Sequence, residues 1–205
     1  HWSTWLHDAV RKCAEYEMMV DIHDEYRPTG FSRTYPNLMT QEGIRGNEEM
    51  PDATHNTILP YTRFLAGAGD YTLCYFNSRV KNTKAHQFAM YKGEEELEFW
   101  KAIPTVWDES RALDGEIGEY IVQARRSGKE WFVGAMTNTE ARTITLTTDF
   151  LKPGTKYIVN LYEDDDKLNT RTKVRTTHKK IKAGDKLTLK LKSSGGAALH
   201  FTLAE

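Results

Sequence analysis

The chain has 205 residues, which at about 150 residues per domain suits one large domain or two small ones. Its 28 Lys and Arg residues balance 29 Asp and Glu residues, so the net charge of −1 provides no positive field to attract nucleic acid or an anionic membrane. A hydrophobic content of 39% with five Trp residues excludes a disordered chain, and no apolar run reaches the roughly 20 residues of a membrane span.

The first part of the chain alternates helical patterns with polar loops. Residues 1–17 place apolar side chains three and four positions apart, which predicts an amphipathic helix. The apolar run at residues 18–23 predicts a buried strand that leads into a charged loop with Pro28 and Gly30. Helix, strand and charged loop form the repeating unit of an α/β barrel or a doubly wound sheet. In both folds, chemistry is usually built just beyond the carboxyl ends of strands.

The next segment is predicted to be a long functional loop. Residues 31–50 show no clean periodicity, and a loop of about 20 residues inside a compact domain is usually functional or disordered. Interleaved apolar side chains such as Phe31 and Ile44 argue against disorder. Helical patterns follow at residues 57–65, 78–90 and 94–103.

Beyond Gly115 the pattern changes to short alternating runs separated by turn residues. Strands are predicted at residues 119–124, 131–136, 142–147, 156–162, 186–191 and 197–203. Short strands at this rhythm indicate a small antiparallel β-sandwich. The acidic run at residues 163–166 fits a solvated turn or a calcium loop, although it lacks the glycine and terminal glutamate of an EF-hand.

Carboxylates, guanidiniums and a histidine are concentrated between His23 and Glu49. Asp24, Glu42 and Glu48 lie on irregular backbone, so they are free to converge. Three converging carboxylates repel one another unless a cation neutralises them or one of them stays protonated. Calcium accepts several carboxylate oxygens, and a carboxylic acid with a raised pKa can protonate a leaving oxygen. The cluster is therefore a candidate active site.

Several of these residues also have structural interpretations. Glu49 is more readily explained as the acidic start of a helix than as a catalytic group. Arg27 and Arg33 fit ion pairs as well as ligand contacts, and His23 fits either a buried imidazole or a substrate contact. For His55 a core or helix-start position is favoured.

Four stretches in this region resemble a known family. They are VDIHDEYRPTG at 20–30, SRTYPN at 32–37, EGIRGNE at 42–48 and TRFLAG at 62–67. In this order they resemble glycoside hydrolase family 97, which contains calcium-dependent α-glucosidases and α-galactosidases of polysaccharide-degrading bacteria. The similarity continues at 104–108 (PTVWD) and 130–134 (EWFVG).

The resemblance implies an α/β plus all-β fold. Family members have an amino-terminal β-sandwich, a central (β/α)8 barrel and a carboxyl-terminal β module. Residues 1–116 are then the carboxyl-terminal portion of a (β/α)8 TIM-type barrel, and residues 117–205 are a small antiparallel β-sandwich. About one βα unit of the family is expected to be missing after Met90. Since a closed barrel takes about 250 residues, the barrel is expected to be incomplete and the chain alone to have little or no activity.

The resemblance also implies residue roles. Glu48 matches the family's general acid, which acts as the acid/base and also contacts calcium, and Glu42 matches a calcium ligand. Asp24 falls where inverting members carry a Glu that acts as base and touches calcium. The surrounding sequence is more similar to the retaining branch, whose Asp nucleophile lies on an earlier barrel strand. No residue of this chain matches that nucleophile.

The favoured prediction is a fragment of an exo-acting, retaining α-galactosidase that uses Ca²⁺ and removes terminal α-linked galactose from an oligosaccharide. The expected sugar contacts are His23, Asp24, Arg27 and Arg33. An inverting α-glucosidase of the same family, a non-catalytic carbohydrate-binding β module and an inert structural fragment are the alternatives. No nucleic-acid partner or membrane span is expected, and the family implies a periplasmic or secreted bacterial location.

Overall fold

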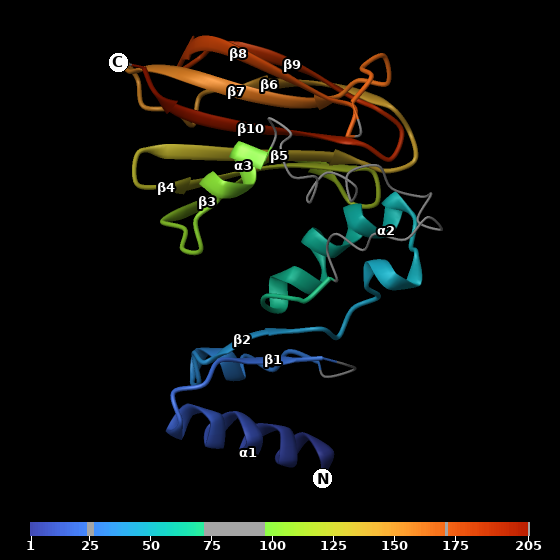
Figure 1. The fold of residues 1–205 in the computed structure, drawn as a ribbon, viewed down its shortest axis with the longest axis vertical. Coiled ribbons are helices and arrows are strands. Elements are labelled where there is room, and N and C mark those ends of the chain that lie inside the picture. Colours follow the sequence, from blue (N-terminus) through green and yellow to red (C-terminus); the bar gives the residue numbers. More distant parts are fainter. Residues whose placement is uncertain (24–26, 72–96, 171, 205) are drawn as a thin grey trace.

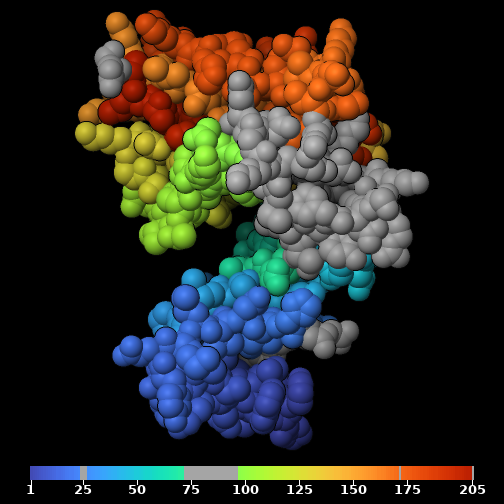
Figure 2. Space-filling view, in the orientation of Figure 1, coloured from blue at the N-terminus to red at the C-terminus, as the bar shows by residue number. Residues whose placement is uncertain are grey.

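The structure is a computed structural model that describes residues 1–23, 27–71, 97–170 and 172–204. Strands dominate it and helices are few. Figure 1 shows two parts stacked along the long axis, with the amino-terminal elements at one end and a β-sandwich at the other. In the space-filling view of Figure 2, the blue amino-terminal part lies at one end and the orange and red strands of the sandwich lie at the other. None of the helices in the described ranges combines the length and apolar character that a membrane crossing needs.

A helix and two parallel strands form the amino-terminal part. Their bounds are α1 (Trp2–Glu15), β1 (Val20–Ile22) and β2 (Leu38–Gln41). Val10 of α1 packs against Ile22 and Leu38, so one face of the strands is covered by the helix. The predicted helix and the first predicted strand are thus confirmed. The loop prediction for residues 31–50 is wrong at β2, because this four-residue strand is defined by pairing with β1 rather than by apolar alternation.

A third segment extends this parallel arrangement. Gln41 forms an isolated parallel bridge with Gly69, and the backbone N–H of Asp70 donates to the Gln41 carbonyl at 3.0 Å. Three chain segments therefore run side by side in the same direction. This order is typical of neighbouring strands in a βα barrel, and the partial barrel itself stays a prediction.

Short helices connect this part to the sandwich. Their bounds are η1 (Phe31–Arg33), η2 (Asn47–Glu49), α2 (Ala53–Ile58), η3 (Leu59–Tyr61), η4 (Arg63–Ala66) and α3 (Leu97–Ala102). The single helix predicted at residues 57–65 is wrong, because α2 ends at Ile58 and Pro60, which lacks an N–H, enters a 3-10 turn. The helix predicted at residues 78–90 lies outside the described residues. The one predicted at 94–103 is confirmed over the span of α3.

The sandwich consists of a six-stranded and a two-stranded antiparallel sheet. The larger sheet has the order β3-β4-β5-β10-β7-β8, and β6 pairs with β9 in the smaller one. The strands are β3 (Glu109–Glu116), β4 (Tyr120–Ser127), β5 (Glu130–Thr137), β6 (Arg142–Thr147), β7 (Lys156–Asp164), β8 (Val174–Lys182), β9 (Lys186–Leu191) and β10 (Gly196–Leu203). All the predicted strands are present. β3 belongs to this sheet although it precedes the boundary predicted between residues 116 and 117.

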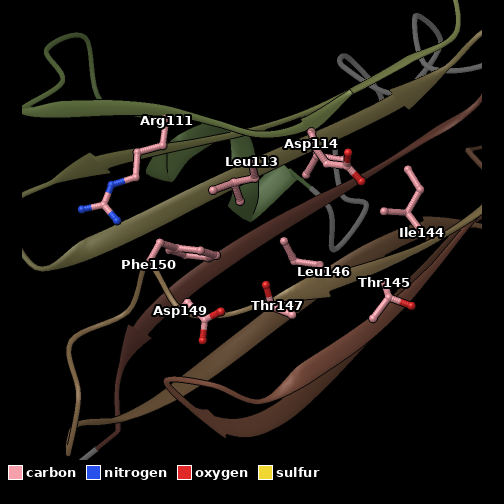
Figure 3. Close-up of a pocket in the computed structure, with 10 residues that line it drawn as sticks. Arg111, Leu113, Asp114, Ile144, Thr145, Leu146, Thr147, Asp149 and Phe150 are labelled. Carbon is pink, nitrogen blue, oxygen red and sulfur yellow. The ribbon is translucent and has the colours of Figure 1, made fainter. Parts of the chain in front are cut away.

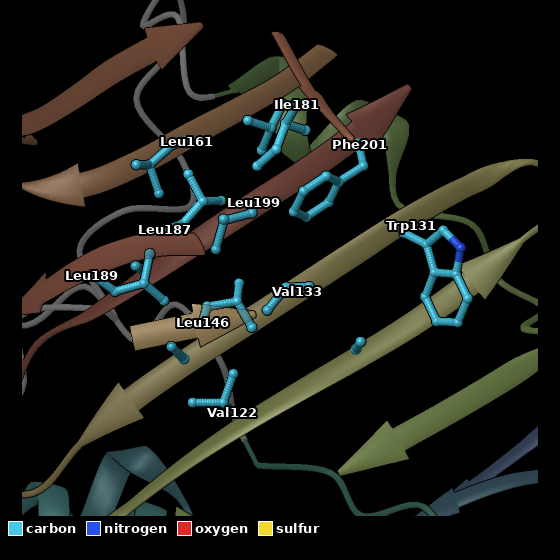
Figure 4. Close-up of a cluster of buried hydrophobic side chains, with 14 of the residues drawn as sticks. Val122, Trp131, Val133, Leu146, Leu161, Ile181, Leu187, Leu189, Leu199 and Phe201 are labelled. Atoms are coloured by element: carbon cyan, nitrogen blue, oxygen red, sulfur yellow. The ribbon is translucent and has the colours of Figure 1, made fainter. Parts of the chain in front are cut away.

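The core of the sandwich lies between its two sheets. Val133 and Leu199 of the large sheet face Leu146 and Leu189 of the small one, as Figure 4 shows. Strand β9 alternates exposed and buried positions along its whole length, which is typical of a strand with one face in the core. On the outer face, Phe99 of α3 meets the ring of Phe132 at 6.0 Å between centroids.

Candidate active site

The candidate site begins where β1 and β2 end. Glu42 follows β2, and its backbone N–H donates to the Ile22 carbonyl at 2.8 Å. Its carboxylate Oε2 lies 3.3 Å from Nδ1 of His23, the residue that follows β1. Because parallel strands bring their carboxyl ends to one edge, the two residues meet although they are distant in sequence. The Glu42 side chain is buried, whereas His23 is exposed.

Arg63 holds the end of β2 in place. Its guanidinium donates to the carbonyls of Gln41 at 3.0 Å and Glu42 at 3.1 Å, and also to the Gly67 carbonyl at 3.0 Å. Burial lowers the pKa of this guanidinium from its usual value. Arg63 therefore ties the backbone at Glu42 to the loop that leads to Asp70. It lies in the TRFLAG stretch, to which the sequence assigned no role.

Asp21 and Asp70 add further carboxyl groups beside Glu42. Burial raises the pKa of Asp21, and so does Asp70, whose carboxyl repels the charge of Asp21 and shares a hydrogen bond with it. Glu42 raises this pKa further, whereas His23 lowers it. Neither carboxylate of this pair was predicted as a site residue. The available signal was the strand period of two, which places Asp21 and His23 on the face opposite Ile22.

Glu48 lies on the 3-10 turn η2. Its Oε2 atom is buried and has no hydrogen-bond partner among the residues that the structure describes. The carboxylate folds back over Gly46: a Cβ added to this glycine would lie 2.8 Å from Glu48 Cδ and closer still to both carboxylate oxygens. Glu48 also lies near Tyr71. Burial raises the pKa of Tyr71 to about 12, and the negative charge of Glu48 contributes to this rise. The structure thus places a half-buried carboxylate with one unsatisfied oxygen at this turn.

Helix α2 and Tyr71 anchor the turn that carries Glu48. The backbone N–H of Asn47 donates to the Tyr71 carbonyl at 3.0 Å, and the Tyr71 hydroxyl donates to Asn56 Oδ1. His55 Nε2 lies 2.9 Å from the carbonyl oxygen of Arg45. His55 directly, and Asn56 through Tyr71, therefore hold the chain at the start of this turn. His55 occupies the helix-start position that was favoured for it.

Glu49 plays a different part from the one predicted. Helix α2 begins at Ala53, and Asp52 caps it by accepting from the backbone N–H groups of Thr54 and His55. The prediction that Glu49 begins this helix is therefore wrong. Its Oε2 atom instead pairs with Nε of Arg45 at 3.2 Å.

Of the other predicted sugar contacts, Arg27 and Arg33 fall within the described residues. Arg27 and Arg33 have exposed side chains, and Arg33 ends the 3-10 helix η1. Asp24 lies outside the described residues.

The donor set suits calcium only in part. No three His, Cys, Asp or Glu side chains of the described chain are arranged to hold a metal ion. Glu42 and Glu48 are nevertheless the hard oxygen ligands that calcium prefers. The unpartnered Oε2 of Glu48 is a buried oxygen that a cation would satisfy. The two predicted ligands that lie within the described residues, Glu42 and Glu48, thus have suitable chemistry.

The acidic run at residues 163–166 is only partly a turn, because Glu163 and Asp164 end strand β7 and the chain turns after them. Glu163 accepts from the backbone N–H of Lys190 at 3.1 Å, and Asp164 accepts from that of Gly196 at 3.2 Å. The backbone N–H of Lys167 and the Arg175 guanidinium lower the pKa of Asp165. These carboxylates therefore stabilise the local backbone of the sandwich.

A cavity of about 400 Å³ lies within the sandwich, away from Glu42 and Glu48. Figure 3 shows Arg111, Leu113 and Asp114 of β3 facing β6 and the residues that follow it, including Phe150. Glu42 and Glu48 have the more suitable chemistry for hydrolysis, because the Glu42 carboxylate is buried and Glu48 has an unsatisfied oxygen.

A carboxylate at the ends of parallel strands, a second one on a nearby turn and a β-sandwich fit the class of glycoside hydrolases. A family model described as "Glycoside hydrolase 97" matches residues 2–44, and one described as "Glycosyl-hydrolase 97 C-terminal, oligomerisation" matches residues 106–202. The two matches together cover more than half of the chain. The chain belongs to glycoside hydrolase family 97.

Named relatives agree with this membership. The chain is 32% identical, over 231 residues, to a retaining alpha-galactosidase of Bacteroides thetaiotaomicron, a match that covers 93% of this chain and 35% of the relative. It is 28% identical to a probable retaining alpha-galactosidase of Streptomyces bingchenggensis, covering 95% of this chain and 33% of that protein. The chain spans about a third of the length of these curated relatives.

A solved structure has the same fold. It is a family 97 enzyme from Pseudoalteromonas sp. strain K8 in complex with panose, which is 31% identical with a TM-score of 0.83. The match covers 98% of this chain and 37% of that protein.

Proposed function

We propose that this chain is part of an exo-acting, retaining α-galactosidase that releases terminal α-linked galactose from an oligosaccharide. The observation that carries the proposal is the half-buried Glu48 carboxylate, whose Oε2 has no partner within the described structure. Sequence identity to a retaining alpha-galactosidase over most of the chain supports galactose as the sugar that is released. A periplasmic or secreted location belongs to the same proposal and rests on the family resemblance.

In the proposed mechanism, Glu48 donates a proton to the glycosidic oxygen as the bond to the anomeric carbon breaks. An Asp on an earlier barrel strand of the full-length enzyme attacks that carbon and forms a glycosyl-enzyme intermediate. Glu48 then accepts a proton from the water that releases galactose. His23, Asp24, Arg27 and Arg33 are the proposed contacts to the sugar hydroxyls.

The proposal includes a division of the chain into two domains. The residues before β3 form the carboxyl-terminal portion of a (β/α)8 barrel, and the sandwich begins with β3 at Glu109 rather than at residue 117. The segment proposed to be missing after Met90 falls among residues outside the described ranges. An alignment of 231 residues, longer than the 205 residues of this chain, supports the missing segment.

An inverting α-glucosidase is the second candidate. The Pseudoalteromonas enzyme is described in complexes with panose and with acarbose. Since that enzyme and the alpha-galactosidases match this chain at similar identity, the sugar and the stereochemistry must be measured.

The test is the product formed by the full-length protein. We expect hydrolysis of nitrophenyl α-galactoside with α-galactose as the first product by NMR, because a double displacement retains the anomeric configuration. The matching α-glucoside is the control substrate, and we expect it to react at least about tenfold more slowly. Faster hydrolysis of the glucoside with β-glucose formed first would instead establish the inverting α-glucosidase.

We further propose that Glu42 and Glu48, together with Asp24, hold a calcium ion. When bound, the ion would orient the acid and stabilise developing negative charge. Removing one carboxylate charge by Glu42→Gln should weaken calcium binding at least about tenfold in the metal-stripped full-length protein, measured by titration calorimetry. Glu49→Gln is the matched control, because its carboxylate pairs with Arg45 instead. Equal calcium affinity in Glu42→Gln and the unchanged protein would contradict this assignment.

A further inference from the structure

The turn between β3 and β4 docks on the helices that follow the Glu48 turn. The hydroxyl of Tyr61 in η3 donates to the backbone carbonyl of Tyr120 at 2.9 Å. The backbone N–H of Gly118 donates to the Thr57 carbonyl of α2 at 3.4 Å. A Cβ added to Gly118 would lie 3.8 Å from a side-chain carbon of Ile58, so the turn sits directly against α2. The sandwich therefore touches the amino-terminal part through this turn.

The docking turn is itself firmly held. The Asn138 side chain donates to the Gly118 carbonyl at 3.1 Å, and the Asn138 backbone N–H donates to the Glu119 carbonyl at 2.7 Å. Gly118 adopts a φ of 77°, a left-handed conformation that favours glycine. Because both carbonyls are bound by the same residue of the sandwich, the turn is a preformed surface for α2.

Helix α2 needs such support. It has only six residues, whereas isolated helices shorter than about 12 residues are marginal in water. Its Asp52 cap stabilises one end, and the contacts to the β3–β4 turn lie toward the other. Figure 1 shows α2 between the sandwich and the parallel strands.

The same helix anchors the proposed acid. His55 of α2 contacts the Arg45 carbonyl, and Asn56 accepts from the Tyr71 hydroxyl, while the Tyr71 carbonyl accepts from the Asn47 backbone N–H. Hydrogen bonds thus connect the sandwich surface, through α2, to the turn that carries Glu48. Displacing α2 would displace the turn on which the Glu48 carboxylate is carried.

We propose that the sandwich acts as a positioning element for catalysis: its β3–β4 turn, through Tyr61 and α2, sets the position of the Glu48 carboxylate. This inference rests on the proposed role of Glu48 as general acid. The β-sandwich would thus position a catalytic group of its own chain, and Tyr61 is a positioning residue.

The test compares substrates that differ in their need for an acid. The dinitrophenolate group of a dinitrophenyl α-galactoside leaves with little protonation. Cleavage of methyl α-galactoside, in contrast, depends on protonation of the leaving oxygen by the acid. In the full-length enzyme, Tyr61→Phe should lower kcat/KM for the methyl substrate, relative to the dinitrophenyl substrate, by about 2- to 10-fold, the effect of one hydrogen bond. Tyr157→Phe, in the sandwich core on β7, is the matched control and should leave the ratio unchanged.

The outcomes separate this inference from the proposed function. Phe keeps the ring of Tyr61, so the variant is expected to fold, and a thermal unfolding curve verifies it. An unchanged ratio in Tyr61→Phe, or an equal loss on both substrates, overturns the positioning role if Glu48→Gln still shifts the ratio strongly. An unchanged ratio in Glu48→Gln overturns the proposed function itself.

Discussion

Glu48→Gln in the full-length enzyme should lower kcat/KM for an unactivated α-galactoside by about 100- to 10,000-fold. The amide has nearly the same shape as the carboxylic acid but cannot deliver a proton to the leaving oxygen. Hydrolysis of a dinitrophenyl α-galactoside should retain most of its first-step rate, because that leaving group needs little protonation. Steady-state kinetics on the two substrates measures the effect.

Glu49→Gln is the matched control for this substitution. Glu49 is adjacent in sequence and lies on the same turn, but its carboxylate is exposed and pairs with Arg45. We expect kcat/KM within about twofold of the unchanged enzyme, because exposed ion pairs contribute little. An equal loss in both variants would mean that the turn tolerates no substitution, and an unchanged rate in Glu48→Gln would exclude this residue as the acid.

Gly46→Ala should reduce kcat/KM for the unactivated substrate by about 100-fold, since a displacement of about 1 Å can cost that much. The added methyl group would occupy the space of the Glu48 carboxylate. Gly46 has a φ of −76°, which alanine adopts without strain, so the effect should fall on the carboxylate rather than on folding. Kinetics on both substrates, with a thermal unfolding curve, tests this expectation.

Gly134→Ala provides the control for the glycine substitution. Gly134 lies in β5, and an added Cβ would meet no atom within 4 Å. This variant should keep its activity. If Gly46→Ala were equally active, the Glu48 side chain would not need the position over Gly46 for catalysis.

The strands of the sandwich were predictable to different degrees. The six that were expected are rich in apolar residues, with strict alternation in β6 and β9, and most are bounded by turn residues. The missed strands, β3 and β8, lie at the two edges of the large sheet. Edge strands are paired on one side only and carry charged residues such as Lys179 and Lys180, so their sequences lack the signal of a buried face.

The site was predictable in its carboxylates but not in its supports. Glu42 and Glu48 stood out because carboxylates concentrate there on irregular backbone. Arg63 and Gly46 did not, since their importance arises from backbone carbonyls and a folded-back side chain. Asp70 was missed because it reaches Asp21 only through the parallel bridge at Gly69.

The sequence by itself determined the family, the strand-rich carboxyl-terminal region and the residue types available for chemistry, because periodicity and motifs are local properties of a chain. Only the tertiary structure decided that His23 meets Glu42, that Glu48 folds over Gly46 and that the β3–β4 turn supports α2. These contacts join segments distant in sequence or depend on the space around a side chain. Strand pairing and packing set them, and no local pattern encodes either.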